Sequence, residues 1–470
     1  MKTQPYLVAA FLLIASTASI AQAAAPRMNV LYIVADDLND NLGCYGNSVV
    51  KSPNVDRLAK HGVRFDRAYC NYPVCNPSRT SFMSGLRPDT TRVVDNKTPT
   101  RAFIKDAVLL PECFRQQGYR TIKVGKIFHT GDGDDFEDPR SWDIDIRENN
   151  TAKKPPEGQI LRKQGKGGIV LRAKDEETWD GFVARKAVTL LEESVQSGKP
   201  FFVAAGFRRP HNPYIAPEKY YALYDPESLQ PRSGPPAHLA KIPDMALSYK
   251  QPHGDKFPTD RPGDTIAAYY ASISFMDAQV GVLLEAMDRL RLWENTIIVF
   301  HSDHGYHLGE HGGLFHKLNL FEETTKVPLI VAAPGRKPGV ASGLVELVDL
   351  YPTLAGLCGL KTPDNLEGLS FAPLLENPSR AWKRAVFTVI SRDGVSFQPS
   401  KGYSPSYMGR TVFDGRRRYT VWPDGSTELY DHASDPYEYA NLAGETKHRA
   451  EIAGMKKLLS DGWKAAVPAQ

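Results

Sequence analysis

Short, nearly continuous apolar runs recur along this chain, and each of them ends in polar or charged residues. The clearest runs are 29–35, 201–205, 296–300 and 329–333. An apolar run without polar alternation is typical of a strand that is covered on both faces, as in a parallel sheet. The pattern therefore predicts several buried strands with polar side chains at their carboxyl ends.

Segments with a helical pattern separate these runs. A helix is predicted at 179–196, where apolar residues recur at helical spacing and Gly198 ends the pattern. A longer helix is predicted at 265–290, with Asp264 as its N-cap. Residues 130–177 show little periodicity, and we predict a long loop that borders a cleft. The alternation of strands and helices predicts an α/β fold with a large, doubly wound, mostly parallel sheet.

The pattern changes after about Pro373. Short strands joined by Asp-Gly turns are predicted at 385–390, 410–413, 418–422 and 428–430, and a helix at 448–463. This pattern predicts a smaller antiparallel sheet with one packing helix. We therefore expect an α/β domain at 24–375 and a C-terminal α+β subdomain at 376–470.

The first residues have the features of a secretory signal peptide. Lys2 supplies a positive charge, 7–14 is apolar, and Ala21 and Ala23 form a small-x-small cleavage site. We predict a signal peptide at 1–23 and an exported, periplasmic or secreted protein. A non-cleaved anchor is the alternative, but the apolar run is short for a bilayer, and no later segment predicts a membrane span.

Composition adds few constraints. The chain of 470 residues is 41% hydrophobic and 24% charged, with a net charge of +4, which gives no indication of nucleic-acid binding. An odd number of cysteines in an exported protein suggests that one thiol is chemically special. The sequence leaves open whether the other four form disulfides or stay buried thiols. The cysteines are Cys44, Cys70, Cys75, Cys113 and Cys358.

Polar side chains follow three of the predicted strands. Asp36-Asp37 ends the first, Lys126 and His129 follow a strand at 120–124, and Asp303-His304 follows another. Because the carboxyl ends of parallel strands meet at one edge of a sheet, we expect these groups to lie together. Three carboxylates suit a hard divalent cation, with calcium the first choice and magnesium the next. Zinc would more usually take additional His or Cys ligands.

Residues Cys75-Asn76-Pro77-Ser78-Arg79 predict an anion-binding site beside the expected cation. Pro77 suits the first turn of a helix at 77–84, which Gly85 would end. Cys75 would then lie at a helix N-terminus, where exposed N–H groups favour anions, and Arg79 lies one turn further on. An isolated cysteine would more often be a small buried hydrophobe.

The string Cys-x-Pro-Ser-Arg resembles the maturation signature of sulfatases. With the other matching stretches, the chain resembles the type I sulfatases of the alkaline phosphatase superfamily, and most of all iduronate-2-sulfatase-like enzymes. The matching stretches include 29–38, 42–46, 87–92, 124–129, 209–211, 302–312, 345–357 and 429–442. The resemblance implies an alkaline phosphatase-like fold and the hydrolysis of a sulfate ester.

The resemblance also implies a modified nucleophile and a metal. In this family the signature cysteine, here Cys75, is oxidised to formylglycine, and a hydroxyl of the hydrated aldehyde attacks sulfur. Arg79 holds that hydrate. Calcium is implied on Asp36, Asp37, Asp303, His304 and the modified residue 75.

Further roles follow from the same resemblance. Lys126 and Lys317 stabilise charge on the sulfate oxygens. His211, together with Lys317, protonates the departing sugar oxygen, and His129 assists collapse of the sulfated hydrate. The implied partners are a sulfated oligo- or polysaccharide, with a 2-O-sulfated uronic acid as the expected site of attack, and a maturation enzyme that makes formylglycine. Glycosaminoglycans and algal glycans both fit.

Two alternatives remain at this point. The first is a phosphodiesterase or phosphonate monoester hydrolase of the same superfamily, which shares the metal site. The second is a non-catalytic glycan-binding relative, which the complete set of candidate catalytic residues argues against.

Overall fold

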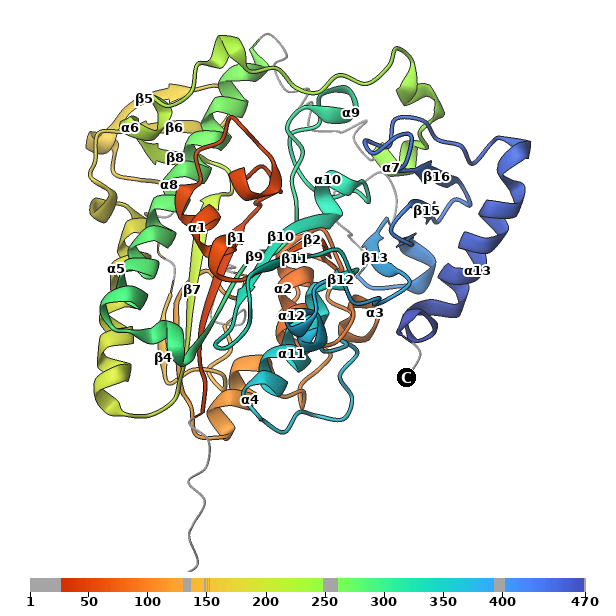
Figure 1. Ribbon diagram of the computed structural model, residues 1–470. Helices are drawn as coiled ribbons and strands as arrows, with labels where there is room; N and C mark the ends of the chain where they lie inside the picture. The colour runs from red at the N-terminus through yellow and green to blue at the C-terminus, as the bar shows by residue number, and fades with distance from the viewer. Residues whose placement is uncertain are drawn as a thin grey trace, which may run out of the picture.

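A nine-stranded sheet forms the centre of the main domain in this computed structural model (Figure 1). The structure describes residues 27–129, 137–147, 149, 151, 153–247, 261–392 and 402–468. The predicted signal peptide at 1–23 lies outside the described residues. The strands are β1 Asn29–Asp36, β2 Val63–Tyr69, β3 Arg120–Gly125, β4 Ile144–Ile146, β7 Phe201–Pro210, β9 Thr296–Ser302, β10 Lys326–Ala332, β11 Gly339–Ala341 and β12 Val345–Glu346.

The strand order confirms the predicted doubly wound, mostly parallel sheet. The order is β11-β2-β10-β9-β1-β7-β3-β4, with β12 paired to β2. β1 lies in the middle and pairs in parallel with β7 and β9, while β10 is antiparallel to both of its neighbours. The carboxyl ends of β1, β3, β7 and β9 therefore meet at one edge.

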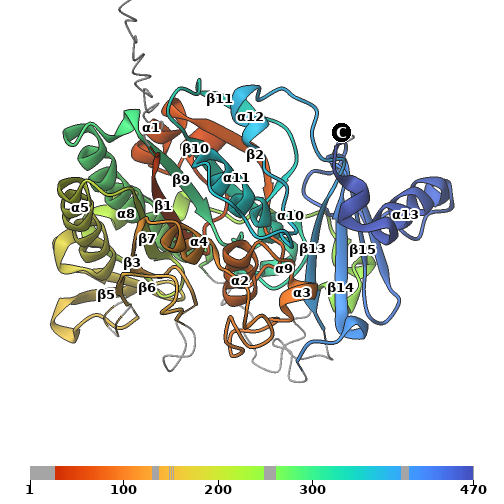
Figure 2. The ribbon, with the colours of Figure 1, turned by 90° about the horizontal axis from the view of Figure 1, so that it is seen from below.

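Helices cover both faces of this sheet, as the view from below shows (Figure 2). Side chains of β1 alternate between two cores, with Leu31 and Ile33 in one and Val30 and Tyr32 in the other. This is why the strand sequence is apolar at every position. One face carries α1 Pro53–His61, α5 Trp179–Ser197 and α8 Pro262–Arg289; the other carries α2 Cys75–Ser84, α4 Leu110–Gln116, α11 Leu350–Leu357 and α12 Ala372–Glu376.

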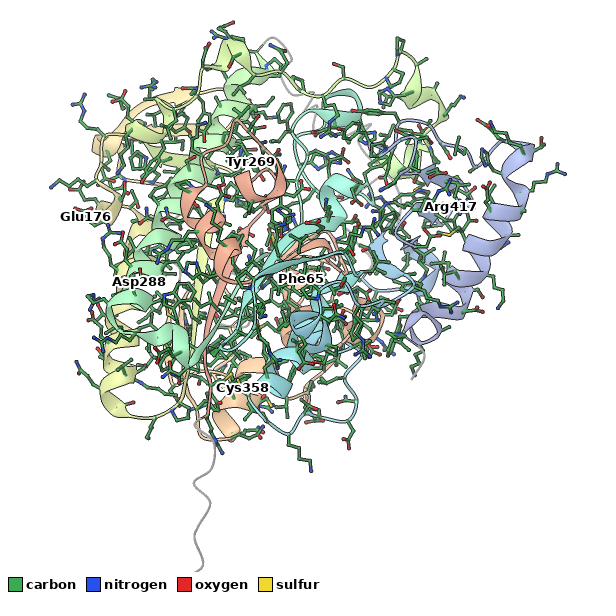
Figure 3. All side chains as sticks on the ribbon, in the orientation of Figure 1. Phe65, Glu176, Tyr269, Asp288, Cys358 and Arg417 are labelled. Atoms are coloured by element: carbon green, nitrogen blue, oxygen red, sulfur yellow. The ribbon has the colours of Figure 1, made fainter. Side chains whose placement is uncertain are left out.

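Side chains fill the space on either face of the sheet (Figure 3). Tyr269 of α8 belongs to the first core and Phe65 of β2 to the second, and both are fully buried. The longest described helix, α8, begins at Pro262 with Arg261 as its N-cap, so the predicted cap at Asp264 is wrong by one turn.

A second, smaller sheet follows the main domain. It is antiparallel in the order β13-β14-β15-β16, and its helix α13 packs on it (Figure 2). The elements are β13 Val386–Ser391, β14 Met408–Phe413, β15 Arg417–Val421, β16 Thr427–Asp431 and α13 Arg449–Ala466. The predicted C-terminal sheet and helix are confirmed; the exact division at 375 and 376 stays a prediction.

The sequence prediction missed several strands. Strand β2 precedes the Cys75 segment, and it was missed because its charged residues alternate with apolar ones near the edge of the sheet. The region predicted as one long loop at 130–177 contains β4 and a hairpin, which joins a third sheet. The first strand of the hairpin is polar because it is half-exposed. That sheet consists of β5 Ile160–Gln164, β6 Gly168–Leu171 and β8 Tyr214–Pro217.

Short helices complete the described fold: α3 Pro88–Thr91, α6 Glu218–Tyr221, α7 Asp244–Leu247, α9 Glu310–Gly313 and α10 Glu322–Thr325. None of the five cysteines forms a disulfide, and four of them are buried. Among the described helices, none combines the length and apolarity that crossing a bilayer requires.

A buried ion-pair network ties the two domains together. Lys383 precedes β13 and reaches Glu346 at 2.8 Å and Asp349 at 2.7 Å, while Arg87 binds Glu346 at 2.6 Å. Burial raises the pKa of Glu346, but Arg87 and Lys383 outweigh it and lower that pKa to about 2. Glu346 is therefore charged, whereas burial raises the pKa of Asp349 despite its bond to Lys383, so that the charge of Asp349 depends on this lysine.

We predict that Lys383→Met lowers the free energy of unfolding by about 3–5 kcal/mol, because it leaves buried carboxylate charge uncompensated. Urea unfolding followed by fluorescence measures the change. Lys457→Met removes an ion pair whose lysine is 75% exposed, and should cost less than about 1 kcal/mol. Equal effects of the two substitutions would contradict this account of the interface.

Candidate active site

The Cys75 helix opens directly onto the edge where the parallel strands end. α2 begins at Cys75, two residues earlier than predicted, and ends as predicted at Gly85, which has φ +67°. The Cys75 side chain is buried. Although burial and Asp36 raise the pKa of this thiol, Lys317 and Lys126 outweigh them and hold it below its ordinary value. The site therefore favours negative charge at position 75.

Arg79, one turn further along α2, joins the ends of three strands. Its Nε donates to Asp303 Oδ2 at 2.9 Å, and a terminal nitrogen donates to Asp36 Oδ1 at 3.1 Å. The other terminal nitrogen donates to the carbonyls of Lys126 and Ile127 at 2.7 and 3.0 Å. All of these groups are buried, so Arg79 fixes the strand ends relative to the helix.

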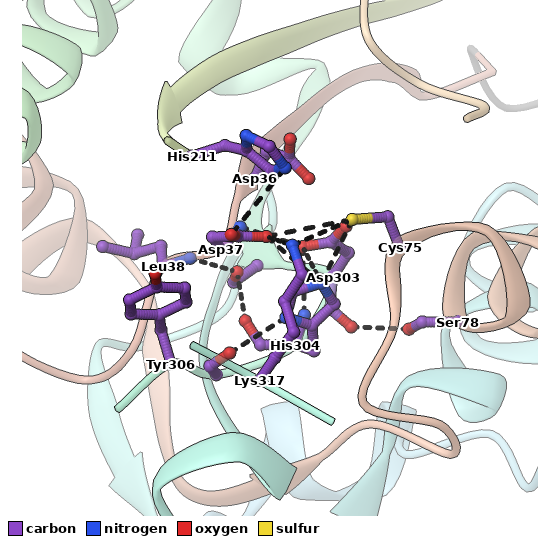
Figure 4. A network of polar contacts seen from close by, with 12 residues as sticks. Asp36, Asp37, Leu38, Cys75, Ser78, His211, Asp303, His304, Tyr306 and Lys317 are labelled. Carbon is purple, nitrogen blue, oxygen red and sulfur yellow. Dashed lines mark hydrogen bonds and ion pairs between the residues drawn. The ribbon is translucent and has the colours of Figure 1, made fainter. Parts of the chain in front are cut away.

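Four of the five predicted metal-binding side chains form one cluster. Each of Asp36, Asp37, Cys75 and His304 offers a donor atom, and these atoms lie within 4.8 Å of one another. His304 Nε2 is 3.3 Å from Asp37 Oδ1 and 3.3 Å from Cys75 Sγ (Figure 4). The Nδ1 of His304 lies 2.9 Å from the carbonyl of Gly305, which directs Nε2 toward the cluster.

Asp303, the fifth predicted ligand, lies beside this cluster. Its Oδ1 is 3.7 Å from His304 Nε2 and accepts from the backbone N–H of Asp37 at 3.2 Å, while its Oδ2 binds Arg79. The cluster, with Asp303 beside it, suits a bound cation because most of its ligand atoms are carboxylate oxygens. Buried carboxylates that lie this close together require positive charge beside them. Burial raises the pKa of Asp37 to about 7, which shows how poorly the isolated site holds its full negative charge.

Asp37 adopts a left-handed backbone conformation, with φ +63°. Three hydrogen bonds hold it there. Tyr269 Oη donates to the Asp37 carbonyl at 2.7 Å and accepts from Asn39 N–H at 3.0 Å, and the N–H of Leu38 donates to Ser302 Oγ at 2.9 Å. A non-glycine residue keeps such a conformation only where its surroundings impose it. This backbone conformation directs the Asp37 side chain toward the other metal-binding side chains.

Two lysines place positive charge around Cys75. Lys317 Nζ donates to Asp37 Oδ1 and lies 3.4 Å from Cys75 Sγ (Figure 4). Lys126 Nζ donates to Asp36 Oδ2. Burial alone would lower the pKa of Lys317, but Asp37 and Cys75 raise it well above its usual range. The two ammonium groups, together with a bound cation, would supply the positive charge that a tetrahedral oxyanion needs.

The two predicted proton-transfer histidines border the same groups. His211 Nε2 is 3.9 Å from Asp37 Oδ2, and follows β7 directly. Burial and Lys317 lower the pKa of His211 well below 6.5, and burial and Lys126 lower that of His129 to about 2. Both rings are therefore neutral in the free protein. An anionic substrate beside His211 would favour its protonated form.

The structure thus brings all predicted site residues to one sheet edge. Sequence reasoning missed Tyr269, Ser302 and Ser78, whose Oγ donates to the Asp303 carbonyl at 2.5 Å. Tyr269 lies within the apolar pattern of α8 and Ser302 at the end of a strand, so neither gave a signal. Their contacts come from segments more than two hundred positions away in the chain.

Comparison with known proteins identifies the class. Residues 28–360 match the family model Sulfatase, and residues 309–464 match the model N-sulphoglucosamine sulphohydrolase, C-terminal. The chain therefore belongs to the sulfatase family, and it is a sulfuric ester hydrolase.

Individual proteins of known name are similar to this chain over most of its length. Iduronate 2-sulfatase of Mus musculus is 36% identical, over 94% of this chain and 95% of that protein. The crystal structure of phosphonate monoester hydrolase of Agrobacterium radiobacter has a TM-score of 0.81 at 25% identity, covering 92% of this chain and 95% of the other. A structure of a 2-O GAG sulfatase has a TM-score of 0.72 at 24% identity over 95% of both chains, which bears on the fold alone.

We predict that Tyr269→Phe weakens binding of a divalent cation by about 5- to 10-fold, because the loss of one hydrogen bond to a buried carbonyl costs about 1 kcal/mol. Calorimetric titration of the purified protein with calcium measures the affinity. Tyr270→Phe, the next residue of α8, is the matched control, since Tyr270 packs on Tyr224 and the hydroxyl that donates to the Asp37 carbonyl is that of Tyr269. Unchanged calcium affinity in Tyr269→Phe would contradict the role given to the strained Asp37.

Proposed function

We propose that the protein is an exported sulfatase that removes the 2-O-sulfate of a uronic acid in a sulfated saccharide, with formylglycine at position 75 and calcium as its cofactors. The observation that carries the proposal is the position of Cys75. Its side chain lies at a helix N-terminus between the carboxylate cluster and Lys317, where an attacking oxygen would meet an anionic sulfate group.

The carboxylates support a bound cation. Asp36, Asp37, Asp303 and His304, together with residue 75, would hold calcium, and the cation would neutralise charge on the sulfate oxygens. The oxygen-rich donor set favours calcium over zinc, with magnesium the nearest competitor. Lys126 and Lys317 add positive charge from the protein itself.

The reaction proceeds in two steps. In the first, one hydroxyl of the hydrated formylglycine, whose proton the bound cation would help to release to water, attacks sulfur, and the bond between sulfur and the sugar oxygen breaks. His211, protonated beside the anionic substrate and aided by Lys317, donates its proton to that oxygen. Arg79 holds the strand ends, and so keeps residue 75 in line with the sulfate.

In the second step His129 takes the proton of the remaining hydroxyl. The bond between carbon and the sulfate oxygen breaks, inorganic sulfate leaves, and the aldehyde returns to be hydrated by water. In the free protein His129 is a neutral ring with a low pKa, about 2, and the negative charge of the sulfated intermediate would raise that pKa so that the ring can accept a proton. The two steps avoid direct attack of water on a poor electrophile.

The substrate assignment rests on relatives. Iduronate 2-sulfatase is the name of a 36% identical protein that aligns over nearly its whole length. That name points to sulfate on the 2-position of a uronic acid. Glycosaminoglycans and algal glycans both contain sulfated uronates, so we propose the uronate 2-sulfate as the common group.

The alternative with specific support is a phosphonate monoester hydrolase. The structural likeness to that enzyme is high, and the same pocket would accept a phosphonate. The sulfatase family match and the curated sulfatase relatives favour sulfate. A non-catalytic glycan-binding role has less support, because every predicted catalytic side chain is present at one site.

Export and maturation complete the proposal. The signal-like sequence at 1–23 supports a periplasmic or secreted protein, and Cys75 would require a maturation enzyme before it can act. We propose no nucleic-acid partner, in keeping with the small net charge.

The test is sulfate release from a panel of defined substrates by the matured enzyme. The panel contains saccharides that end in a 2-sulfated iduronate, other sulfated uronates, algal galactan and fucan pieces, and a phenyl phosphonate ester. We expect release from the 2-sulfated uronates to exceed turnover of the phosphonate by at least about 10²-fold, a difference of about 3 kcal/mol in transition-state binding. Preferential release from another sugar would overturn the substrate, and preferential phosphonate cleavage would overturn the proposed reaction.

We predict that His211→Asn lowers kcat/KM for a sugar sulfate by about 10²–10³-fold, because a sugar alkoxide is a poor leaving group that needs a proton. An aryl sulfate such as 4-nitrophenyl sulfate leaves without one, and should lose less than about 10-fold. Steady-state kinetics on both substrates measure the difference. Equal losses on the two substrates would exclude His211 as the general acid.

A further inference from the structure

Arg392, which directly follows β13, is a buried arginine that forms no ion pair with a carboxylate of the described residues. It is 2% exposed, and its hydrogen bonds go to backbone carbonyls. Buried Arg79, Arg87 and Arg418 each pair with at least one carboxylate. Burial lowers the pKa of Arg392 to about 10, so the group is still charged at neutral pH. A buried cation of this kind needs a structural or functional reason.

The guanidinium instead binds three backbone carbonyls. Its Nε donates to Met245 of α7 at 3.1 Å, one terminal nitrogen donates to Ser391 at 3.2 Å, and the other donates to Leu318. Its planar face lies over Trp422 of the C-terminal sheet, 5.3 Å from the ring centroid. Arg392 therefore joins the C-terminal sheet to two segments of the main domain.

The hydrogen bond to Leu318 connects Arg392 to the active site. Leu318 has φ +83°, an unfavourable conformation for a bulky side chain, and it immediately follows Lys317. Its backbone carbonyl accepts from Arg392, and its side chain packs in a small core with Phe321, Ile390 and Trp422. A charge-assisted hydrogen bond is stronger than one between neutral groups, so it can hold this strained residue in place.

Several bonds hold the loop that carries Lys317 on the side before this residue. His307 N–H donates to the His316 carbonyl at 2.9 Å, and Tyr306 Oη donates to the Phe315 carbonyl at 2.6 Å. On the side after Lys317, Arg392 donates to the carbonyl of Leu318. A side chain of the C-terminal subdomain is thus one of the restraints on the segment from which Lys317 points toward Asp37 and Cys75.

We propose that Arg392 is a positioning residue through which the C-terminal subdomain sets Lys317 against residue 75. This inference rests on the role of Lys317 in the proposed function. It assigns the C-terminal subdomain a part in sulfate turnover at the reacting centre, in addition to its packing on the main domain.

The decisive experiment is a double-mutant cycle on the matured enzyme, with 4-nitrophenyl sulfate as substrate. Lys317→Ala should lower kcat/KM by about 10²-fold or more, because a charged partner of the sulfate is lost. Arg392→Ala should lower it by about 10–10²-fold through misplacement of Lys317. In the Lys317→Ala background, Arg392→Ala should then change kcat/KM by less than about twofold. If the losses in kcat/KM from the two single substitutions instead multiply in the double variant, the positioning role of Arg392 is overturned.

Control variants distinguish misplacement of Lys317 from a general loss of stability. Arg410→Ala removes another ion pair between the domains, to Asp89 at 2.7 Å, but leaves the Lys317 loop untouched, and should change kcat/KM by less than about twofold. If Arg392→Ala does not fold, Arg392→Lys keeps the charge and the stem, and is carried through the same cycle. Added guanidinium ion should restore turnover in Arg392→Ala but not in the double variant.

The outcomes also distinguish this inference from the proposed function. Full activity of Lys317→Ala would refute the catalytic role of Lys317, and this inference with it. Loss of activity in Lys317→Ala with full activity in Arg392→Ala would refute only the inference. A loss in Arg392→Ala confined to substrates with a second anionic group would instead make Arg392 a substrate contact, which overturns positioning.

Discussion

The site depends on the balance of charge at the end of β1. Asp36, Asp37 and Asp303 are almost completely buried, and carboxylates cannot be packed in this way without compensating cations. Arg79, Lys126 and Lys317 match these three charges within hydrogen-bond distance. A bound divalent cation would add the positive charge that an anionic substrate needs. The same balance explains why an anionic sulfate ester, and not a neutral ester, suits the pocket.

The order of the strands in the sheet brings these charged groups together. Because β9, β1, β7 and β3 are adjacent and parallel, their carboxyl ends deliver Asp303, Asp36, His211 and Lys126 to one edge. α2 then places Cys75 over that edge, and Arg79 fixes it there. The C-terminal sheet contributes from outside, since its Arg392 binds the carbonyl beside Lys317.

Much of this arrangement could be predicted from the sequence. The apolar runs located most of the central strands, and the polar residues after them located the site, because a strand buried on both faces has a distinct pattern. Strand β2 and the β5–β6 hairpin were missed, since their polar residues lie on half-exposed edges. Tyr269 could not be predicted as a support of Asp37. Its hydroxyl meets the Asp37 carbonyl only after α8 packs on β1, and no local pattern encodes that contact.

The central claim is that residue 75, as formylglycine, is the nucleophile for sulfate release. The most direct test is to prepare the protein with graded conversion of Cys75, quantify the conversion by peptide mass, and measure the initial rate of sulfate release from a 2-sulfated uronate disaccharide. The account predicts a rate proportional to the converted fraction, with none remaining at zero conversion. Substantial sulfate release by fully unconverted protein would contradict it.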